Sequence, residues 1–249
     1  MNVLQRYGIK EVADVVFYKL NTDGTPGNIA LVLDSLKISN IEETAESVDA
    51  TGGKGNAPLI TWDYGKSITL TLQDALFSPA SMALMHGAAT PSLAATTVTR
   101  VMRVVATATG AYPAVQYTLN GTTVTISTTT NNLKFYDAEG HEQTTAASID
   151  KGEILFAKFE QTSGASGGTT LEINADTFPG TYYITGDTYA RDEVTGEDTY
   201  FQFIIPKAKI NSNVTLNMQA EGDPTVFDMS IRVLRPTNKV MMKLVQYEL

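Results

Sequence analysis

The chain has 249 residues, enough for one large all-β domain or two small ones, and its 27 acidic and 18 basic residues give a net charge of −9. This acidic balance argues against tight, sequence-independent binding to duplex nucleic acid, which needs Lys and Arg to displace counterions from phosphates. The chain has no cysteine, which excludes a disulfide framework, a thiolate metal site and a thiol nucleophile. It also lacks a signal-like amino terminus and any run approaching ~18 apolar residues, so we expect a protein made in a cytoplasm, with no membrane partner.

Alternation of apolar and polar residues, which places successive side chains on opposite faces of a strand, recurs along the whole chain. In chain order it predicts strands at residues 15–20, 36–41, 67–73, 154–159, 182–190, 201–205, 214–219 and 227–233. Pro206 is expected to stop the strand at 201–205 sharply. In three of these strands the alternation also predicts the residues that face a core, which are Ile68, Leu70, Leu72, Val214, Leu216, Met218, Phe227, Met229, Ile231 and Val233.

One helix and one hairpin have clear local signals. Ser78 suits the N-cap of a short helix, Pro79 its first position and Gly87 its terminator. Asn120 and Gly121 lie between two β-rich runs and suit a type I′ turn, in which both central residues have positive φ. We expect the helix to contact the core of the domain through Leu76, Phe77, Met82, Leu84 and Met85.

Two segments interrupt the strand pattern. Residues 43–59 are long, Gly-rich and mixed in charge, and a loop of more than ~12 to 15 residues is uncommon unless it binds something or is disordered. Residues 160–170 are expected to form a flexible, exposed connection. Because residues 90–130 are rich in Thr and Ala and low in charge, a single domain over 1–249 with an inserted or decorating lobe at about 107–150 is the predicted organisation.

No motif in the sequence supports catalysis, a cofactor or a metal ion. The Gly-Lys-Ser run at 65–67 would need a glycine at position 60 to form a phosphate-binding loop, and that position is Ile60. His86 and His141 have no second histidine or cysteine for metal binding, and the acidic runs at 137–142 and 190–199 lack the oxygen spacing of a calcium loop. Core and interface packing is expected to account for Trp62 and the eleven tyrosines. We therefore expect a protein that is not an enzyme.

Three stretches together resemble the tail tube (major tail) protein family of long-tailed bacteriophages. Residues 59–87 join a Trp-Asp-Tyr-Gly-Lys run to an alternating strand and the short helix. Residues 178–210 contain a Pro-Gly-Thr-Tyr strand, a charged hairpin and an Ile-Pro-Lys-Ala-Lys exit. Residues 216–234 place a turn at Ala220 to Pro224 between two alternating strands. The three stretches cover about a third of the chain.

The resemblance implies a virion structural protein with an all-β fold, mainly β with one short helix. Its architecture would be a tail-tube-like β-sandwich or barrel with a flanking helix and a long inter-subunit loop. Six copies would close into a ring, and rings would stack into a hollow tail tube, assembled in the host cytoplasm, through which phage DNA passes. Further partners would be tape measure, terminator, baseplate and sheath proteins. Candidate inter-subunit loop residues are Asp49, Gly52, Gly53, Lys54, Gly55 and Asn56.

Three alternatives remain open at this point. One is another virion component, such as a tail terminator, a baseplate ring or a head decoration protein. A second is an adhesin or carbohydrate-binding β-sandwich, and a third is an unrecognised hydrolase, for which no pair of carboxylates stands out.

Overall fold

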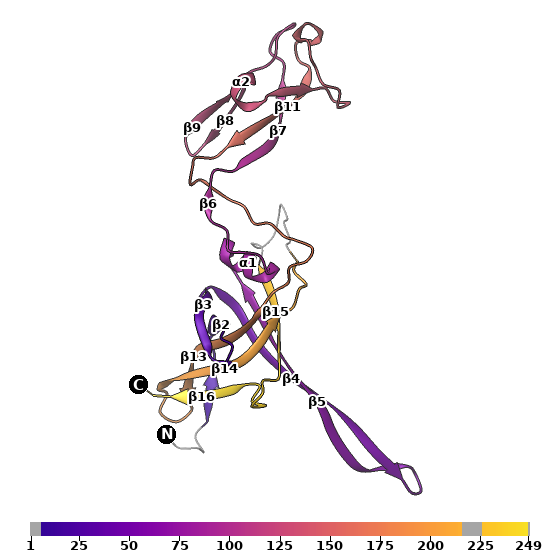
Figure 1. Ribbon diagram of the computed structural model, residues 1–249, viewed down its shortest axis with the longest axis vertical. Helices are drawn as coiled ribbons and strands as arrows, with labels where there is room; N and C mark the ends of the chain where they lie inside the picture. Colours follow the sequence, from indigo (N-terminus) through magenta and orange to yellow (C-terminus); the bar gives the residue numbers. More distant parts are fainter. Residues whose placement is uncertain (1–5, 216–225, 249) are drawn as a thin grey trace. The chain divides into compact units, whose positions relative to one another are not determined.

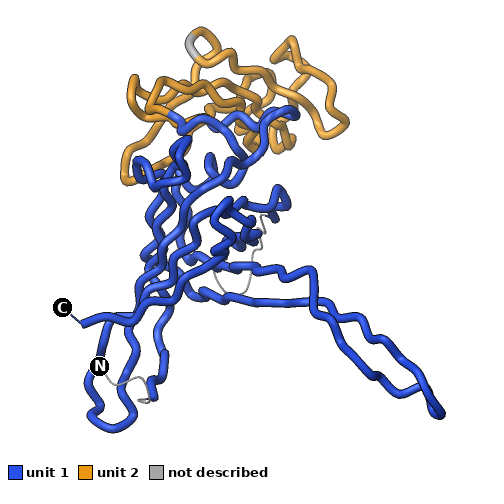
Figure 2. The backbone as a smooth tube through the Cα atoms, turned by 60° about the horizontal axis from the view of Figure 1, so that its bottom comes forward, with its two compact units in different colours: residues 1–91, 171–249 blue, residues 92–170 orange. Residues whose placement is uncertain are grey.

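The computed structural model describes residues 6–215 and 226–248, and it confirms an all-β fold with one short helix. The chain divides into two compact units (Figure 2). Unit 1 comprises Met1–Pro91 and Leu171–Leu249, and unit 2 comprises Ser92–Thr170. The lobe predicted at about 107–150 lies within unit 2.

A nine-stranded antiparallel sheet forms most of unit 1 (Figure 1). Its main path runs in the order β3-β2-β13-β14-β15-β5-β4, with β1 beside β13 and β16 beside β14. The elements of unit 1 are β1 (Tyr7–Ile9), β2 (Asp14–Leu20), β3 (Pro26–Leu33), β4 (Leu36–Gly52), β5 (Ala57–Asp74), α1 (Pro79–His86), β13 (Thr181–Asp192), β14 (Asp198–Ile210), β15 (Phe227–Val233) and β16 (Lys243–Tyr247).

The sheet of unit 1 curls around a single apolar core. Val15 and Phe17 of β2 share this core with Leu70 and Leu72 of β5, although three strands separate β2 from β5 in the sheet. The core-facing residues predicted for the strands at 67–73 and 227–233 are all buried. Val214 packs against the core from a segment outside the strands, whereas Leu216, Met218 and the turn at Ala220 to Pro224 lie outside the described residues.

The expected stop at Pro206 is wrong, because β14 continues through it to Ile210. Ile205 pairs with Ile184 and Ala208 with Tyr182, so β14 has one more residue than β13 between these two pairs. Such a bulge leaves a position free of ladder bonds, where proline, which has no N–H to donate, is tolerated. The extra residue also moves the buried positions of β14 from odd numbers, as at Ile205, to even numbers, as at Ala208.

Helix α1 forms with the predicted caps. The side chain of Ser78 accepts a hydrogen bond from the backbone N–H of Ser81, and Gly87 ends the helix with a left-handed φ of 69°. Leu84 and Met85 are buried in the core of unit 1, as expected, and Met82 is half-buried. The prediction is wrong for Leu76 and Phe77, which are 68% and 60% exposed, because they precede the helix in a segment that runs along the surface.

The expectation of a long loop at 43–59 is also wrong, because residues 36–52 and 57–74 form one continuous hairpin of β4 and β5. The second predicted connection, at 160–170, is partly strand, since β11 extends to Thr162 and Gly168–Thr169 forms β12.

Unit 2 has a core of its own, built on a three-stranded sheet in the order β10-β11-β7 and on the hairpin of β8 and β9. Leu155 and Phe159 of β11 are fully buried in it. Asn120 and Gly121 have φ values of 49° and 79°, as a type I′ turn requires. The elements of unit 2 are β6 (Leu93–Ala94), β7 (Thr97–Val105), β8 (Val115–Leu119), β9 (Thr122–Ile126), α2 (Thr128–Asn131), β10 (Lys134–Tyr136), the 3-10 helix η1 (Ala146–Ser148), β11 (Ile154–Thr162) and β12 (Gly168–Thr169).

Candidate functional site

The β4–β5 hairpin continues beyond the sheet of unit 1 as a two-stranded arm (Figure 1). We define the arm as residues 44–67, because β15 pairs with β5 only at Thr69 and beyond. Ten residues separate Ser67 from Ala57, so the arm extends about 33 Å at ~3.3 Å per residue. At its base Lys66 Nζ lies 2.5 Å from Glu43 Oε1. An isolated two-stranded hairpin is only marginally stable in water, so the arm has little stability of its own beyond the sheet.

The arm has one apolar face. Val48 pairs with Trp62 and Ala50 with Ile60, and paired residues point to the same face of a hairpin. Tyr64 follows on the same side. Val48, Ile60, Trp62 and Tyr64 are each between 52% and 55% exposed, which is unusual for large apolar side chains that lie next to one another.

The opposite face of the arm is polar. Asp49 pairs with Thr61, whose hydroxyl donates a hydrogen bond of 2.6 Å to the Asp49 carboxylate. Ser47 pairs with Asp63 one step further along. The arm is therefore an amphipathic ribbon, with an exposed apolar stripe on one face, ended by Glu46 opposite Tyr64, and two carboxylates on the other.

The candidate inter-subunit residues all lie in the outer part of the arm. Asp49 and Gly52 belong to β4, and Gly53, Lys54, Gly55 and Asn56 form the turn at its tip. The turn has positive φ at Gly53, Gly55 and Asn56 and is closed by a hydrogen bond from the Asn56 N–H to the Gly53 carbonyl oxygen. The glycines thus shape an ordered turn. Whether these residues contact another subunit stays a prediction.

The arm residues that the sequence interpretation missed are Ile60, Trp62 and Tyr64. Their signal is present, because these three apolar residues alternate with Thr61 and Asp63. Core and interface packing is the prediction for Trp62 and the tyrosines together; in the single chain the Trp62 side chain is outside the core and half exposed on the arm.

A second surface lies on the side of unit 1 that faces away from the core. Tyr189 of β13 stands beside Tyr200 of β14, which stacks on Tyr247 of β16, with 5.3 Å between ring centroids in each pair. Asp187, on the same face, accepts hydrogen bonds from Gln202 Nε2 at 2.8 Å and from the Tyr247 hydroxyl at 3.4 Å. We call this surface the tyrosine face. Partial burial and the neighbouring Asp187 carboxylate raise the pKa of Tyr247.

Carboxylates lie close together on the tyrosine face. Asp187 and Asp14 are directly opposite each other in the pairing of β13 with β2. Like charges in such a position destabilise a sheet slightly. Among the residues that the structure describes, no three or more His, Asp or Glu side chains are arranged to hold a metal ion.

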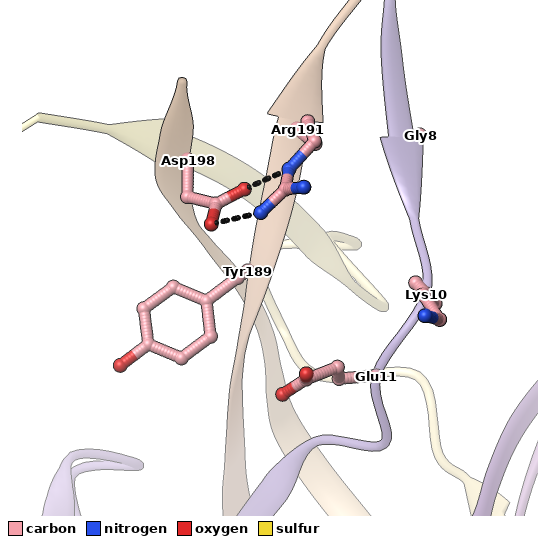
Figure 3. Close-up of a pocket in the computed structure, with 6 residues that line it drawn as sticks. All are labelled: Gly8, Lys10, Glu11, Tyr189, Arg191 and Asp198. Carbon is pink, nitrogen blue, oxygen red and sulfur yellow. Dashed lines mark hydrogen bonds and ion pairs between the residues drawn. The ribbon is translucent and has the colours of Figure 1, made fainter. Parts of the chain in front are cut away.

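A small cleft of about 180 Å³ adjoins the tyrosine face at Tyr189 (Figure 3). It contains a bidentate ion pair in which Arg191 Nε and Nη2 each donate to the Asp198 carboxylate at 2.7 Å. This pairing lowers the pKa of Asp198 and raises that of Arg191. Gly8, Lys10 and Glu11 complete the lining. Arg191 and Asp198 are cross-strand partners of β13 and β14, and their two charges neutralise each other in the cleft.

Neither histidine belongs to the arm, the tyrosine face or the small cleft. His86 is the last residue of α1, and His141 lies in a turn where its Nδ1 is 3.3 Å from Asp137 Oδ2. Over residues 6–215 and 226–248, no helix is long and apolar enough to cross a membrane.

No curated protein matches the chain at a significant level. The model of the YomU/Tube protein family matches residues 7–246, which is nearly the whole chain and includes the arm and the tyrosine face apart from Tyr247. The protein therefore belongs to this family of phage tube proteins and has a structural role in the virion.

Proposed function

We propose that this chain is the tail tube subunit of a bacteriophage, and that six copies close into rings that stack into the hollow tube through which DNA is ejected. The observation that carries the proposal is the exposed apolar face of the arm, formed by Val48, Ile60, Trp62 and Tyr64. Because the chain belongs to a family of tube proteins, we take further copies of the same chain to be what covers this apolar face. The role is structural and not enzymatic.

Free sheet edges support the closing of a ring. The strands β3, β2, β13, β14 and β16 lie side by side, and neither β3 nor β16 has a second neighbour within the described residues. An edge strand presents unpaired N–H and C=O groups that favour pairing with another chain. Pairing β3 of one copy with β16 of the next would join successive sheets, and a closed barrel has no remaining edges.

The tyrosine face would then line the channel. It lies on the outer side of β2, β13, β14 and β16, and it carries Asp14 and Asp187. Carboxylates along the channel would repel the phosphates of DNA, and this repulsion lets the genome pass without binding. Tape measure, terminator and baseplate proteins, with a sheath in a contractile tail, are the further partners that this role implies.

Electron microscopy of the purified protein tests the proposal. Wild-type chains are expected to form long tubes above a critical concentration, whereas closed rings alone, or monomers at every concentration, would refute the tube assignment and favour a terminator or decoration role.

A deletion of Ala50 to Ala57 tests the arm directly. Pro58 to Ile60 can then close the shortened hairpin, since Asp49 still faces Thr61. The variant is expected to keep the circular dichroism spectrum and the unfolding midpoint of the wild type but to form no tubes, because the removed residues lie outside the core. Tubes of normal length from the variant would show that the outer arm is not an assembly element.

A further inference from the structure

A basic cleft lies where β5, β15 and the segment after β15 meet. It has a volume of about 480 Å³, and four of its eight lining residues are cations while none is acidic, although the chain as a whole has a net charge of −9. Its lining consists of Lys66, Ser67, Arg232, Val233, Leu234, Arg235, Lys239 and Met241. Within the part of the chain that the structure describes, Lys66 alone among these cations has a counter-charge, Glu43. Arg232, Arg235 and Lys239 form no ion pair with any residue in 6–215 or 226–248.

The backbone holds these cations in place. Arg232 lies on β15 between the buried residues Ile231 and Val233, so its side chain faces outward from the sheet. Lys239 has a left-handed φ of 63°, a conformation that is sterically unfavourable for a residue other than glycine. Its N–H donates to the Pro236 carbonyl oxygen at 3.0 Å, which closes the turn. Backbone strain of this kind is concentrated at functional sites.

The polar face of the arm has the complementary charge. Asp49 and Asp63 both lie on it, and neither pairs with a cation among the described residues. The arm of a copy cannot bring Asp49 to its own cleft, because Thr61, opposite Asp49, is five residues or about 17 Å along the strand from Lys66. Asp49 can therefore reach a cleft of this kind only on another molecule.

We propose that the basic cleft of one copy binds the carboxylate face of the arm of a second copy, with Asp49 and Asp63 pairing with Arg232, Arg235 and Lys239. This inference rests on the proposed function, in which the arm joins subunits through its apolar face. It adds a partner for the opposite face, so that an arm lies between two further copies with both faces covered. Arginine suits this contact, because its guanidinium can hold a carboxylate by two parallel hydrogen bonds.

Charge reversal tests the pairing. The first variant carries Arg232→Glu and Arg235→Glu, the second carries Asp49→Lys and Asp63→Lys, and the third combines all four substitutions. Lys151→Glu, an exposed lysine in unit 2, is the matched control. The critical concentration for tube formation is measured by sedimentation at several salt concentrations, with circular dichroism to verify that each variant is folded.

The first and second variants are expected to raise the critical concentration at least about tenfold, while the third restores it and the control leaves it unchanged. The wild-type critical concentration should also rise with salt, which screens exposed charges. If wild-type tubes form but charge reversal has no effect, the pairing is wrong and the tube assignment stands. If the wild type forms no tubes at all, both proposals are wrong. Saturable binding of inorganic phosphate to the wild-type cleft, with unchanged assembly of the first variant, would assign the cleft to a phosphate and overturn the pairing.

Discussion

Replacing Trp62 by alanine separates the stability of the fold from the stability of the assembly. Trp62 is 52% exposed in the single chain. A fully covered tryptophan buries 150–250 Å², so about 110 Å² of this side chain remains for a partner. At ~25 cal/mol per Å², covering that area contributes about 3 kcal/mol to assembly, which corresponds to a roughly 100-fold higher critical concentration for Trp62→Ala. Within the monomer the substitution removes only a cross-strand pair with Val48, worth about 0.2–1 kcal/mol in the arm.

The assay compares two measurements on the same variant. Urea unfolding of the monomer should have nearly the wild-type midpoint, whereas sedimentation should show tubes only at much higher protein concentration. Leu119→Ala is the matched control, because Leu119 is also large, apolar and 60% exposed, but lies on a hairpin of unit 2 to which assembly is not assigned. The reasoning is refuted if Trp62→Ala assembles at the wild-type concentration, or if both variants impair assembly equally.

Two further substitutions test the fold of unit 1. Gly87→Ala is expected to lower the free energy of unfolding by about 3 kcal/mol, because its φ is 69° and a Cβ would lie 2.2 Å from the backbone carbonyl carbon of Phe178. Gly24→Ala, at a φ of 84° with open space around it, should lower the free energy of unfolding only by the cost of the left-handed backbone. If urea unfolding gives equal losses of free energy for the two substitutions, the steric argument is wrong. Asp192→Asn should destabilise the protein at neutral pH, since the N–H groups of Val194 and Thr195 donate to the Asp192 carboxylate at 2.7 and 2.8 Å and lower its pKa. A group with a lowered pKa stabilises the fold above its unfolded value of about 3.9 and loses this effect as the pH falls through the folded value. The difference in stability between wild type and Asp192→Asn should therefore shrink in acid, and a difference independent of pH would contradict the assignment.

Local patterns in the sequence were sufficient where local geometry decides the structure. Alternation identified β15 and its buried residues, and cap chemistry identified both ends of α1. Pro206 shows the limit of this approach, because a proline ends a strand only where the ladder needs its N–H. Whether a bulge removes that need depends on the register between β13 and β14, which no single segment contains.

The surfaces assigned to assembly were harder to predict than the core. Glycines and charges made residues 43–59 resemble a loop, although the pairing of β4 with β5 continues to Gly52 and Ala57. The tyrosine face combines Tyr189, Tyr200 and Tyr247 from three strands, and only the sheet order makes them neighbours. Burial is decided by the whole fold, which is why Leu76 and Phe77, apolar in sequence, remain exposed in the single chain.

Unit 2 is attached in a manner that makes it exchangeable. Its first and last strands, β6 and β12, pair with each other, and Ser163 N–H donates to the Thr96 carbonyl oxygen nearby. The two ends of the insertion therefore lie side by side, and the closure of the host chain does not depend on what lies between them. Because unit 2 also has its own core, a phage lineage can lengthen, replace or lose this segment of the gene without disturbing the sheet of unit 1. The sheet of unit 1 and the inserted unit can thus evolve at different rates within one polypeptide.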